Sequence, residues 1–399
     1  MRELFGRVFR AVNPTFRQAV KLNGRFDYQQ AQLSEELKRL SAIDGALKSF
    51  AEAVTMNRRY PGSDEFSGEE ATSQLLNEAQ VPHICFRDSN SYSDLDIVKC
   101  IAPDVIFRQS QWEGDIPPAF CVDNLRFAKL YNVPYEIVPI TDHIFTIPTG
   151  FDFWQSLQAL YALNNVLVQK YRTCATLINA GATGHPKVDA ILAEAGSWPI
   201  QTGNTARIFW SVQHSIFSDW NDFGALRAYY ANLLRFAKVH PEIDVVLSLR
   251  PALGASLCRL DHESPQESAK IRAMLDECQM LPNVEVFPNG GYVGPMKAST
   301  LIVSDGMSIL VEGQLTSIPI LYLERHGHVP FSDIGEMIAS GLNRFDKYDD
   351  FSALEEKILY FVNGGEDSAA GFRKKNYALL TEKLNAASNI VAELRRDLI

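Results

Sequence analysis

Short apolar runs alternate with helical stretches over the second half of the chain. The runs occupy residues 206–212, 244–249, 283–287, 300–303 and 319–323. Helical periodicity fills most of the intervals between them, most clearly over 224–239 and 264–280. Continuous apolar strands that alternate with helices are typical of a parallel sheet covered by helices on both faces. This pattern predicts a Rossmann-like domain in the second half.

The first half has a similar but less regular pattern. Apolar runs predict strands at 82–86, 104–107 and 135–139, and helical periodicity predicts helices over 27–58 and 153–172. The junction with the second half is expected near residues 190–205, where segments 197–199 and 202–204 have a composition that suits a linker.

These patterns predict an α/β fold with two Rossmann-like domains whose parallel sheets face each other across a cleft, preceded by N-terminal helices. The expected segments are a helical segment (1–60), a first Rossmann-like domain (61–195), a second one (196–375) and a C-terminal helix (376–399). Because ligands of such sheets bind at the carboxyl ends of the strands, the site is expected between the two domains.

Composition indicates a globular cytoplasmic protein. The chain has 399 residues, of which 46% are hydrophobic, and no apolar run is long enough to span a membrane. Its six cysteines are scattered without C-x-x-C spacing, which favours reduced thiols over disulfides or a zinc site. The formal charge of −10 argues against a nucleic-acid partner.

The first 21 residues form a basic amphipathic segment. Five basic side chains against one acidic side chain give it a formal charge of +4, and its apolar residues fall on one helical face. Such a helix can lie on the inner face of an anionic plasma membrane as a peripheral contact. It can equally be an opening helix that packs on its own domain.

The predicted strand 300–303 is followed by a turn of Ser304, Asp305 and Gly306, and then by a helical pattern that contains Ser308. A helix start at the end of a buried strand favours an anion such as phosphate, because its backbone N–H groups have no helical partner. Ordinary helix capping by the serines is the alternative. Glu312 lies one turn after Ser308, either to accept hydrogen bonds from ribose hydroxyls or as a solvated glutamate.

Further polar residues follow other predicted strands. His214 comes after the strand 206–212 and could act as a base or as a donor to phosphate. Arg250 ends the strand 244–249, where it could hold a diphosphate or pair with a carboxylate. His185 and Lys187 suit an anionic ligand or a hinge, with a structural turn as the alternative.

Asp142 and His143 follow the predicted strand 135–139 and are candidates for the base that activates an acceptor. The chain contains no G-x-G-x-x-G, G-x-x-x-x-G-K-[ST] or G-x-S-x-G motif. Dehydrogenase, P-loop and hydrolase interpretations therefore have no support.

The order of these motifs resembles the CDP-glycerol glycerophosphotransferase family, of the teichoic-acid polymerase type, and its relatives in capsule and lipopolysaccharide assembly. The matching stretches are 103–109 with 117–118, then 184–189, Trp210 with 214–216, 240–244 leading to 249–251, and 304–312 followed by 319–322. They span roughly residues 100–330. The first 60 residues carry none of the resemblance.

The resemblance implies a GT-B-like architecture in which the C-terminal domain binds the nucleotide donor, the N-terminal domain binds the acceptor, and no metal is bound. His214, Arg250, Ser304 and Ser308 would hold the donor phosphates, and Glu312 the ribose. Asp305 is a further candidate for donor binding. Two positions depart from the family pattern, in which a histidine stands at Ala252 and a serine at Met307.

The leading hypothesis is a transferase that moves a glycerol-phosphate or sugar unit from a cytidine-nucleotide donor to a hydroxyl of a glycan or lipid-linked acceptor. The first alternative is a glycosyltransferase that uses a UDP-sugar or a CMP-linked acidic sugar such as 3-deoxy-octulosonic acid or sialic acid, with Asp219 or Asp222 near the anomeric carbon. The second is a non-catalytic GT-B binding module, which Ala252 and Met307 favour.

Overall fold

The computed structural model describes 11 segments of the chain. They are residues 53–56, 76–78, 80–81, 83–86, 92–113, 118–142, 151–174, 179–217, 223–250, 253–287 and 291–398. The basic segment 1–21 and most of the predicted helix 27–58 lie outside them. No helix in these segments is both long enough and apolar enough to cross a membrane.

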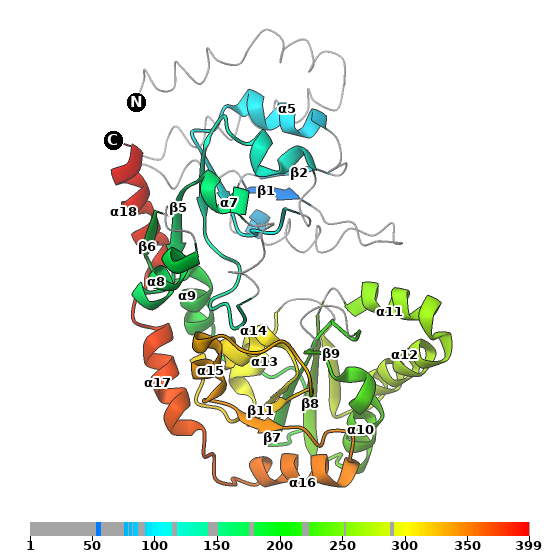
Figure 1. Ribbon diagram of the computed structural model, residues 1–399. Helices are drawn as coiled ribbons and strands as arrows, with labels where there is room; N and C mark the ends of the chain where they lie inside the picture. Colours follow the sequence, from blue (N-terminus) through cyan, green and yellow to red (C-terminus); the bar gives the residue numbers. More distant parts are fainter. Residues whose placement is uncertain are drawn as a thin grey trace.

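The second half of the chain contains a six-stranded parallel sheet (Figure 1). Its strand order is β12-β11-β10-β7-β8-β9. The strands are β7 (Ala206–Val212), β8 (Ile243–Leu249), β9 (Val284–Phe287), β10 (Leu301–Ser304), β11 (Ile320–Leu323) and β12 (Asn343–Phe345). The first five coincide with the five predicted runs, and β12 was not predicted.

Helices cover both faces of this sheet, as the continuous apolar strands require. One face packs against α10 (Leu226–Val239), α11 (Leu253–Glu263), α12 (Pro265–Gln279) and α16 (Phe351–Val362). The other packs against α13 (Val293–Ala298), α14 (Met307–Glu312) and α15 (Asp333–Ala339). Trp210 and Phe209 of β7 are both fully buried, on opposite faces.

The first half contains a four-stranded parallel sheet in the order β3-β4-β5-β6. Its strands are β3 (Val105–Arg108), β4 (Lys129–Asn132), β5 (Leu157–Ala162) and β6 (Ala180–Ala182). The helices of this half are α5 (Tyr92–Ile101), α7 (Phe151–Ser156), α8 (Asn165–Cys174) and α9 (Pro186–Ala193), with the short 3-10 helices η3 (Pro118–Phe120) and η4 (Val122–Asn124). A separate parallel pair joins β1 (Ala53–Met56) to β2 (His83–Phe86).

Three predictions for this half were wrong in part. The predicted helix 153–172 contains strand β5, because its apolar residues have no glycine or proline between them and fit a helical period as well. The predicted strand 135–139 is an unpaired segment whose residues 137–139 are buried and whose Tyr135 is exposed, and the strand before it is β4. Residues 53–56 form β1, although they fall inside the predicted helix 27–58.

The chain ends on the first domain. After α17 (Ala370–Leu380), helix α18 (Ala386–Leu398) runs alongside the N-terminal sheet (Figure 1). Ile390 and Leu394 of α18 pack on the sheet face formed by Tyr131, Ala159 and Tyr161. The Asp189 carboxylate holds the start of α18 by accepting hydrogen bonds from the backbone N–H groups of residues 385 and 386, at 3.1 and 2.6 Å.

The linker between the two domains is fastened to the C-terminal sheet. Asp244 of β8 is fully buried, and its carboxylate accepts hydrogen bonds from Trp198 Nε1 at 3.0 Å and from Thr202 Oγ1 at 2.7 Å. Asn204 donates a third hydrogen bond at 2.9 Å. The burial of this carboxylate is offset by three donors, so the linker follows a fixed path.

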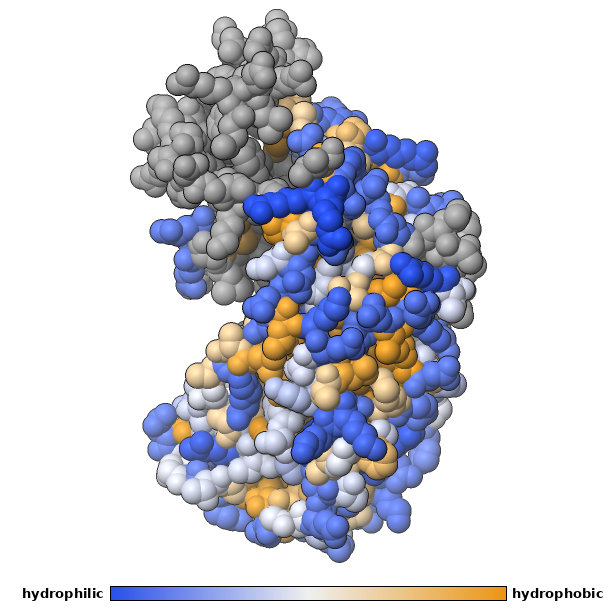
Figure 2. All heavy atoms as spheres, turned by 90° about the vertical axis from the view of Figure 1, so that its left-hand side faces the viewer, coloured by the Kyte–Doolittle hydropathy of each residue, from blue (hydrophilic) through white to orange (hydrophobic). Residues whose placement is uncertain are grey.

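The two domains meet at the carboxyl edge of the N-terminal sheet. The Ser332 backbone N–H donates to the Ile140 carbonyl at 2.9 Å, and Thr141 forms an isolated bridge with Phe331. A Cβ at Gly335 would lie 1.9 Å from the Ile140 oxygen, so the close approach requires glycine there. In the space-filling view the molecule is indented between its upper and lower parts (Figure 2).

Candidate functional site

The C-terminal sheet reverses its strand order next to β7, the first strand of this domain. Strand β7 lies between β8 and β10, so the chain leaves it in opposite directions on the two sides. In open parallel sheets the carboxyl ends of the strands at such a point form the ligand site. The residues that follow β7, β8 and β10 are therefore the first to consider.

Asp305 organises the loops at this point. It is fully buried, and its two carboxylate oxygens each accept a hydrogen bond at 2.7 Å, from the Gln213 and Ala225 backbone N–H groups. Burial raises the pKa of Asp305 to about 6, although these hydrogen bonds act in the opposite direction. The side chain predicted to bind the donor thus fixes both ends of the loop that follows β7.

His214, Ser304 and Ser308 lie around this loop. His214 Nδ1 is 3.0 Å from Gln213 Oε1, which orients the half-buried ring. The Ser304 hydroxyl is buried and accepts a hydrogen bond from the Gly306 N–H at 3.0 Å, so it stabilises the turn. Ser308, on the first turn of α14, remains partly exposed.

Glu312 joins the two domains through its carboxylate. It is 1% exposed at the end of α14, and Lys187, at the start of α9, forms an ion pair with its Oε1. The Tyr292 hydroxyl donates to the other oxygen at 2.7 Å. Burial, and secondly the charge of Glu312, raise the pKa of Tyr292 well above its usual range, so the tyrosine stays a donor.

Arg250 follows β8 and is half-buried. Its positive charge acts on the Tyr292 hydroxyl and lowers the pKa of Tyr292, against the larger effect of burial. No carboxylate in the described parts of the chain forms an ion pair with it. Arg250 is thus a cation at the end of a strand, and it forms no ion pair with the carboxylates that the structure describes.

His185 uses both of its ring nitrogens within the protein. Nδ1 accepts from the Lys187 N–H at 3.1 Å, and Nε2 lies 2.8 Å from the Pro134 carbonyl, so Nε2 carries the proton. Burial lowers the pKa of His185, which keeps the ring neutral. His185 therefore caps α9 and ties it to the segment after β4.

Of the four remaining candidates for catalysis, the structure describes only Asp142. Its carboxylate is 53% exposed and lies 3.0 Å from Lys170 Nζ. His143, Asp219 and Asp222 lie outside the described residues.

Glu136 has a candidate role that the sequence did not indicate. It lies four residues after β4, and its Oε1 accepts a hydrogen bond from Gln111 Nε2 at 3.2 Å. Its Oε2 is buried and makes no hydrogen bond to any described residue. Burial raises the pKa of Glu136 to about 7, and the charge of Lys187 acts against this shift. The sequence does contain one indication of such a role: Glu136 lies inside the run 134–140, which is otherwise apolar apart from Tyr135.

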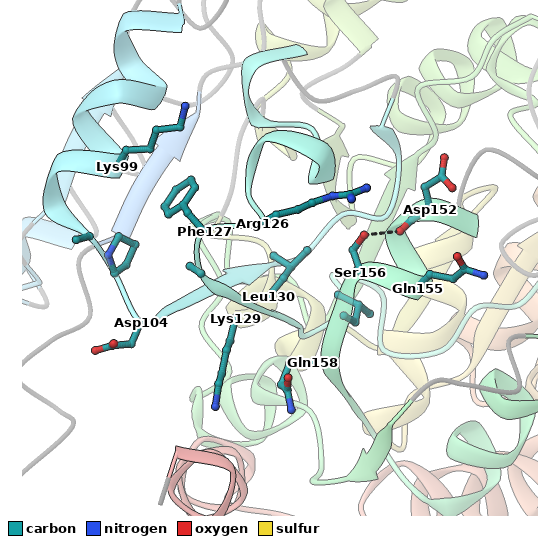
Figure 3. A pocket seen from close by; sticks show the side chains of 14 residues that line it. Lys99, Asp104, Arg126, Phe127, Lys129, Leu130, Asp152, Gln155, Ser156 and Gln158 are labelled. Carbon is teal, nitrogen blue, oxygen red and sulfur yellow. Dashed lines mark hydrogen bonds between the residues drawn. The ribbon is translucent and has the colours of Figure 1, made fainter.

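A hollow of about 1180 Å³ lies at the other edge of the N-terminal sheet (Figure 3). It borders the starts of β3, β4 and β5, and its charged side chains have mixed signs. They are Lys99, Asp104, Arg126, Lys129 and Asp152. Because this is the amino edge of the sheet, the hollow is separate from the residues described above.

Two parallel sheets, each with helices, and a C-terminal helix that returns to the first domain define a GT-B-like fold. No protein-family model and no curated protein sequence match the chain. Among solved structures, it is similar to the UDP-GlcNAc 2-epimerase from Neisseria meningitidis bound to UDP-GlcNAc, with a TM-score of 0.53 and 15% identity over 83% of this chain and 90% of that one. It is also similar to MnaA of S. aureus with UDP, with a TM-score of 0.52 and 10% identity over 83% and 86% of the two chains. These similarities show the fold.

Proposed function

We propose that this protein is a transferase of cell-surface glycan assembly that moves a glycerol-phosphate or sugar unit from a cytidine-nucleotide donor to a hydroxyl of a glycan or lipid-linked acceptor. The observation that carries this proposal is the position of Arg250. It is a cation at the carboxyl end of β8, beside the strand-order reversal, and its charge acts on Tyr292, which donates a hydrogen bond to Glu312.

Each group at this edge has a chemical role in donor binding. Arg250 offers a planar set of N–H donors to the phosphates, and it offsets the charge that develops on the leaving nucleotide. Ser308 and His214 add further donors from the loops after β10 and β7. The Glu312 carboxylate accepts from the ribose hydroxyls when Lys187 or Tyr292 yields its place.

The structures of similar fold favour a nucleotide-linked donor, since one is bound to UDP-GlcNAc and another contains UDP. A UDP-sugar is therefore the second candidate donor. A CMP-linked acidic sugar is the third, and it would require a carboxylate near the anomeric carbon.

Nucleotide binding by the purified full chain tests this proposal. CDP, CMP and UDP are each titrated by calorimetry and compared in thermal melts, where a ligand at about 100 times its Kd adds about 2.7 kcal/mol to the free energy of unfolding. A preference for CDP supports a CDP-linked donor, and a preference for CMP supports a CMP-linked sugar. A preference for UDP replaces the cytidine donor with a UDP-sugar, and no binding to any of the three contradicts the function.

The Arg250→Ala variant tests the residue that carries the proposal. Loss of a charge-assisted hydrogen bond to phosphate is expected to weaken nucleotide binding by about 1.5–3 kcal/mol, measured by the same calorimetry. Arg272→Ala is the matched control, because Arg272 is a half-exposed arginine that pairs with Asp261 on the helices of the same domain. Equal affinities in the two variants would remove Arg250 from the site.

A further inference from the structure

Three loops meet at the carboxyl edge of the N-terminal sheet. They follow β3, β4 and β6, and they carry Gln111, Glu136 and His185. The His185 ring binds the Pro134 carbonyl at 2.8 Å, and the Gln111 amide binds the Glu136 carboxyl group at 3.2 Å. The segment that contains Glu136 is therefore held from both sides, next to the α9 turn that meets the second domain.

The Glu136 carboxyl group is only half satisfied. Its Oε1 accepts the hydrogen bond from Gln111, whereas its Oε2 is buried without a hydrogen-bond partner in the described parts of the chain. Most buried polar atoms of native proteins have a partner, so an exception at a functional edge needs an explanation. Lys187 is the charged group that acts on Glu136, and Lys187 itself pairs with Glu312 of the second domain.

We propose that Glu136 is the catalytic base that activates the acceptor hydroxyl; this inference rests on the proposed function. Glu136 Oε2 takes the proton of that hydroxyl while the hydroxyl oxygen bonds to the transferred centre, which is the phosphorus of a glycerol-phosphate unit or the anomeric carbon of a sugar. The bond from that centre to the nucleotide phosphate oxygen breaks, and its electron pair leaves with the nucleotide. The proton then passes from Glu136 to water.

The environment of Glu136 suits this task better than that of Asp142. A base is most effective when its pKa lies near the working pH, and burial raises the pKa of Glu136 to about 7. Asp142 lies at the same edge of the sheet, but its exposed carboxylate is solvated and paired with Lys170.

The test compares the full-length protein with its Glu136→Gln and Glu136→Asp variants. Turnover is followed as CMP released from CDP-glycerol or from a CMP-linked sialic acid, with glycerol as a small hydroxyl acceptor, between pH 5 and pH 9. Glu136→Gln keeps the hydrogen bond to Gln111 and is expected to fold. Its turnover at pH 8 is expected to fall 100- to 10,000-fold, while the affinity for CDP stays unchanged. Glu136→Asp is expected to keep part of the rate.

The pH profile and a control variant separate a catalytic role from a structural one. The wild-type rate is expected to fall below about pH 7, as Glu136 takes up its proton, and Glu136→Gln is expected to lack this acid limb. Glu382→Gln makes the same chemical change at an exposed position and is expected to match the wild type.

Two results would overturn the inference, and they are distinguishable. A Glu136→Gln variant with the wild-type rate removes Glu136 alone and leaves the transferase function standing. A wild type that binds no nucleotide, or that binds one but never releases a nucleotide from the matching CDP-, CMP- or UDP-linked donor, overturns the transferase function and the role of Glu136 with it.

Discussion

Two glutamates near the domain junction have opposite local environments. Glu312 is buried with a partner on each carboxylate oxygen, Lys187 and Tyr292, so its charge is compensated. Glu136 is half-buried: its Oε1 accepts from Gln111, and its buried Oε2 has no hydrogen-bond partner in the described parts of the chain. The Glu312 oxygens act as hydrogen-bond acceptors, whereas the Glu136 carboxyl group holds its proton until the pH approaches its raised pKa. The two side chains are thus suited to binding and to proton transfer, respectively.

The raised pKa of Glu136 predicts a pH-dependent stability. Burial raises the pKa to about 7 in the folded chain, against about 4.3 in the unfolded chain, so the folded state binds the proton more tightly. The contribution of this group to the free energy of unfolding is therefore fully present below about pH 4 and is lost as the pH rises to 7. The loss is about 3 kcal/mol, and Glu136→Gln, which cannot ionise, is expected to avoid it.

Urea denaturation of the wild type and of Glu136→Gln at pH 5 and pH 8 measures this effect. Other groups titrate over the same range, so the informative quantity is the difference between the two proteins at each pH. The variant is expected to gain stability relative to the wild type at pH 8, and Glu382→Gln, which changes an exposed glutamate, is expected to show no such gain. Parallel pH dependences would show that Glu136 ionises normally.

The sequence located the strand ends of the second domain better than those of the first. Arg250, His214 and Ser308 each follow an apolar strand, and the carboxyl end of a buried strand can be recognised from the sequence. Glu136 was missed because residues 135–139 were predicted to be a strand, where a glutamate has no special meaning. The side-chain pairing of Lys187 with Glu312 joins positions 125 residues apart, and no local pattern encodes it.

The same contrast holds for whole elements. Strands β7 and β8 have seven residues each, of which five are apolar, so their pattern predicts them. Strand β4 has four residues, begins with Lys129 and ends with Asn132, and leaves little periodicity to detect. Strand β5 follows α7 without a break and was absorbed into a predicted helix. The sequence pattern thus predicted the strands that are long and that turn residues separate from their neighbouring elements.

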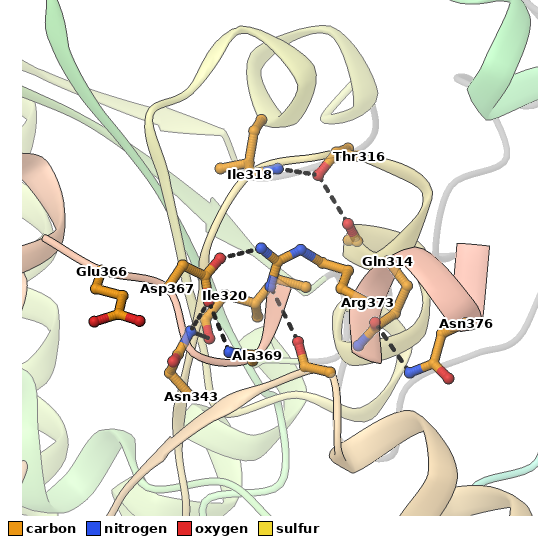
Figure 4. Close-up of polar contacts among 12 residues, drawn as sticks. Gln314, Thr316, Ile318, Ile320, Asn343, Glu366, Asp367, Ala369, Arg373 and Asn376 are labelled. Atoms are coloured by element: carbon orange, nitrogen blue, oxygen red, sulfur yellow. Dashed lines mark hydrogen bonds and ion pairs between the residues drawn. The ribbon is translucent and has the colours of Figure 1, made fainter. Parts of the chain in front are cut away.

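Helix α17 is held to the C-terminal domain by a buried polar cluster (Figure 4). Arg373 is 2% exposed, donates to the Gly341 carbonyl at 3.1 Å and pairs with Asp367. Asp367 also accepts from Asn343 Nδ2 of β12 at 3.0 Å. Asn376, one turn along the helix, donates to the Met337 carbonyl at 3.0 Å. These bonds connect α17 to the sheet and to α15.

Arg373→Met is expected to lower the free energy of unfolding by about 3–5 kcal/mol, because it leaves the largely buried Asp367 carboxylate without its cation. Urea denaturation measures this loss. Lys374→Met is the matched control, since Lys374 is the neighbouring exposed residue on the same helix and its removal is expected to change little. Similar stabilities for the two variants would mean that the Arg373–Asp367 pair contributes no net stability.

At the scale of the whole molecule, a helix that follows the second domain in the sequence packs on the first domain. Helix α18 comes last in the sequence, yet it covers one face of the first sheet (Figure 1). A buried cluster also runs from that sheet through α9 into the helices of the second domain. The first domain is therefore completed only when the end of the chain is in place.

This arrangement predicts that substitutions in α18 lower the stability of the N-terminal domain. Ile390→Ala and Leu394→Ala remove apolar contacts with Tyr131, Ala159 and Tyr161, and each is expected to cost about 2–4 kcal/mol of stability. Hydrogen exchange locates the effect, since amides of β4 and β5 are expected to lose protection while those of β7 and β8 keep it.

The control for these variants is Ser388→Ala, at an exposed position of the same helix, which is expected to leave exchange in both sheets unchanged. If the Ile390 and Leu394 variants speeded exchange equally in both sheets, the two domains would unfold as one cooperative unit through the shared cluster. If they changed hydrogen exchange in neither sheet, the packing of α18 would contribute nothing to the stability of the first domain. Loss of protection confined to β4 and β5 instead means that α18 stabilises the sheet of the first domain, and β4 of that sheet leads directly into the segment that carries Glu136.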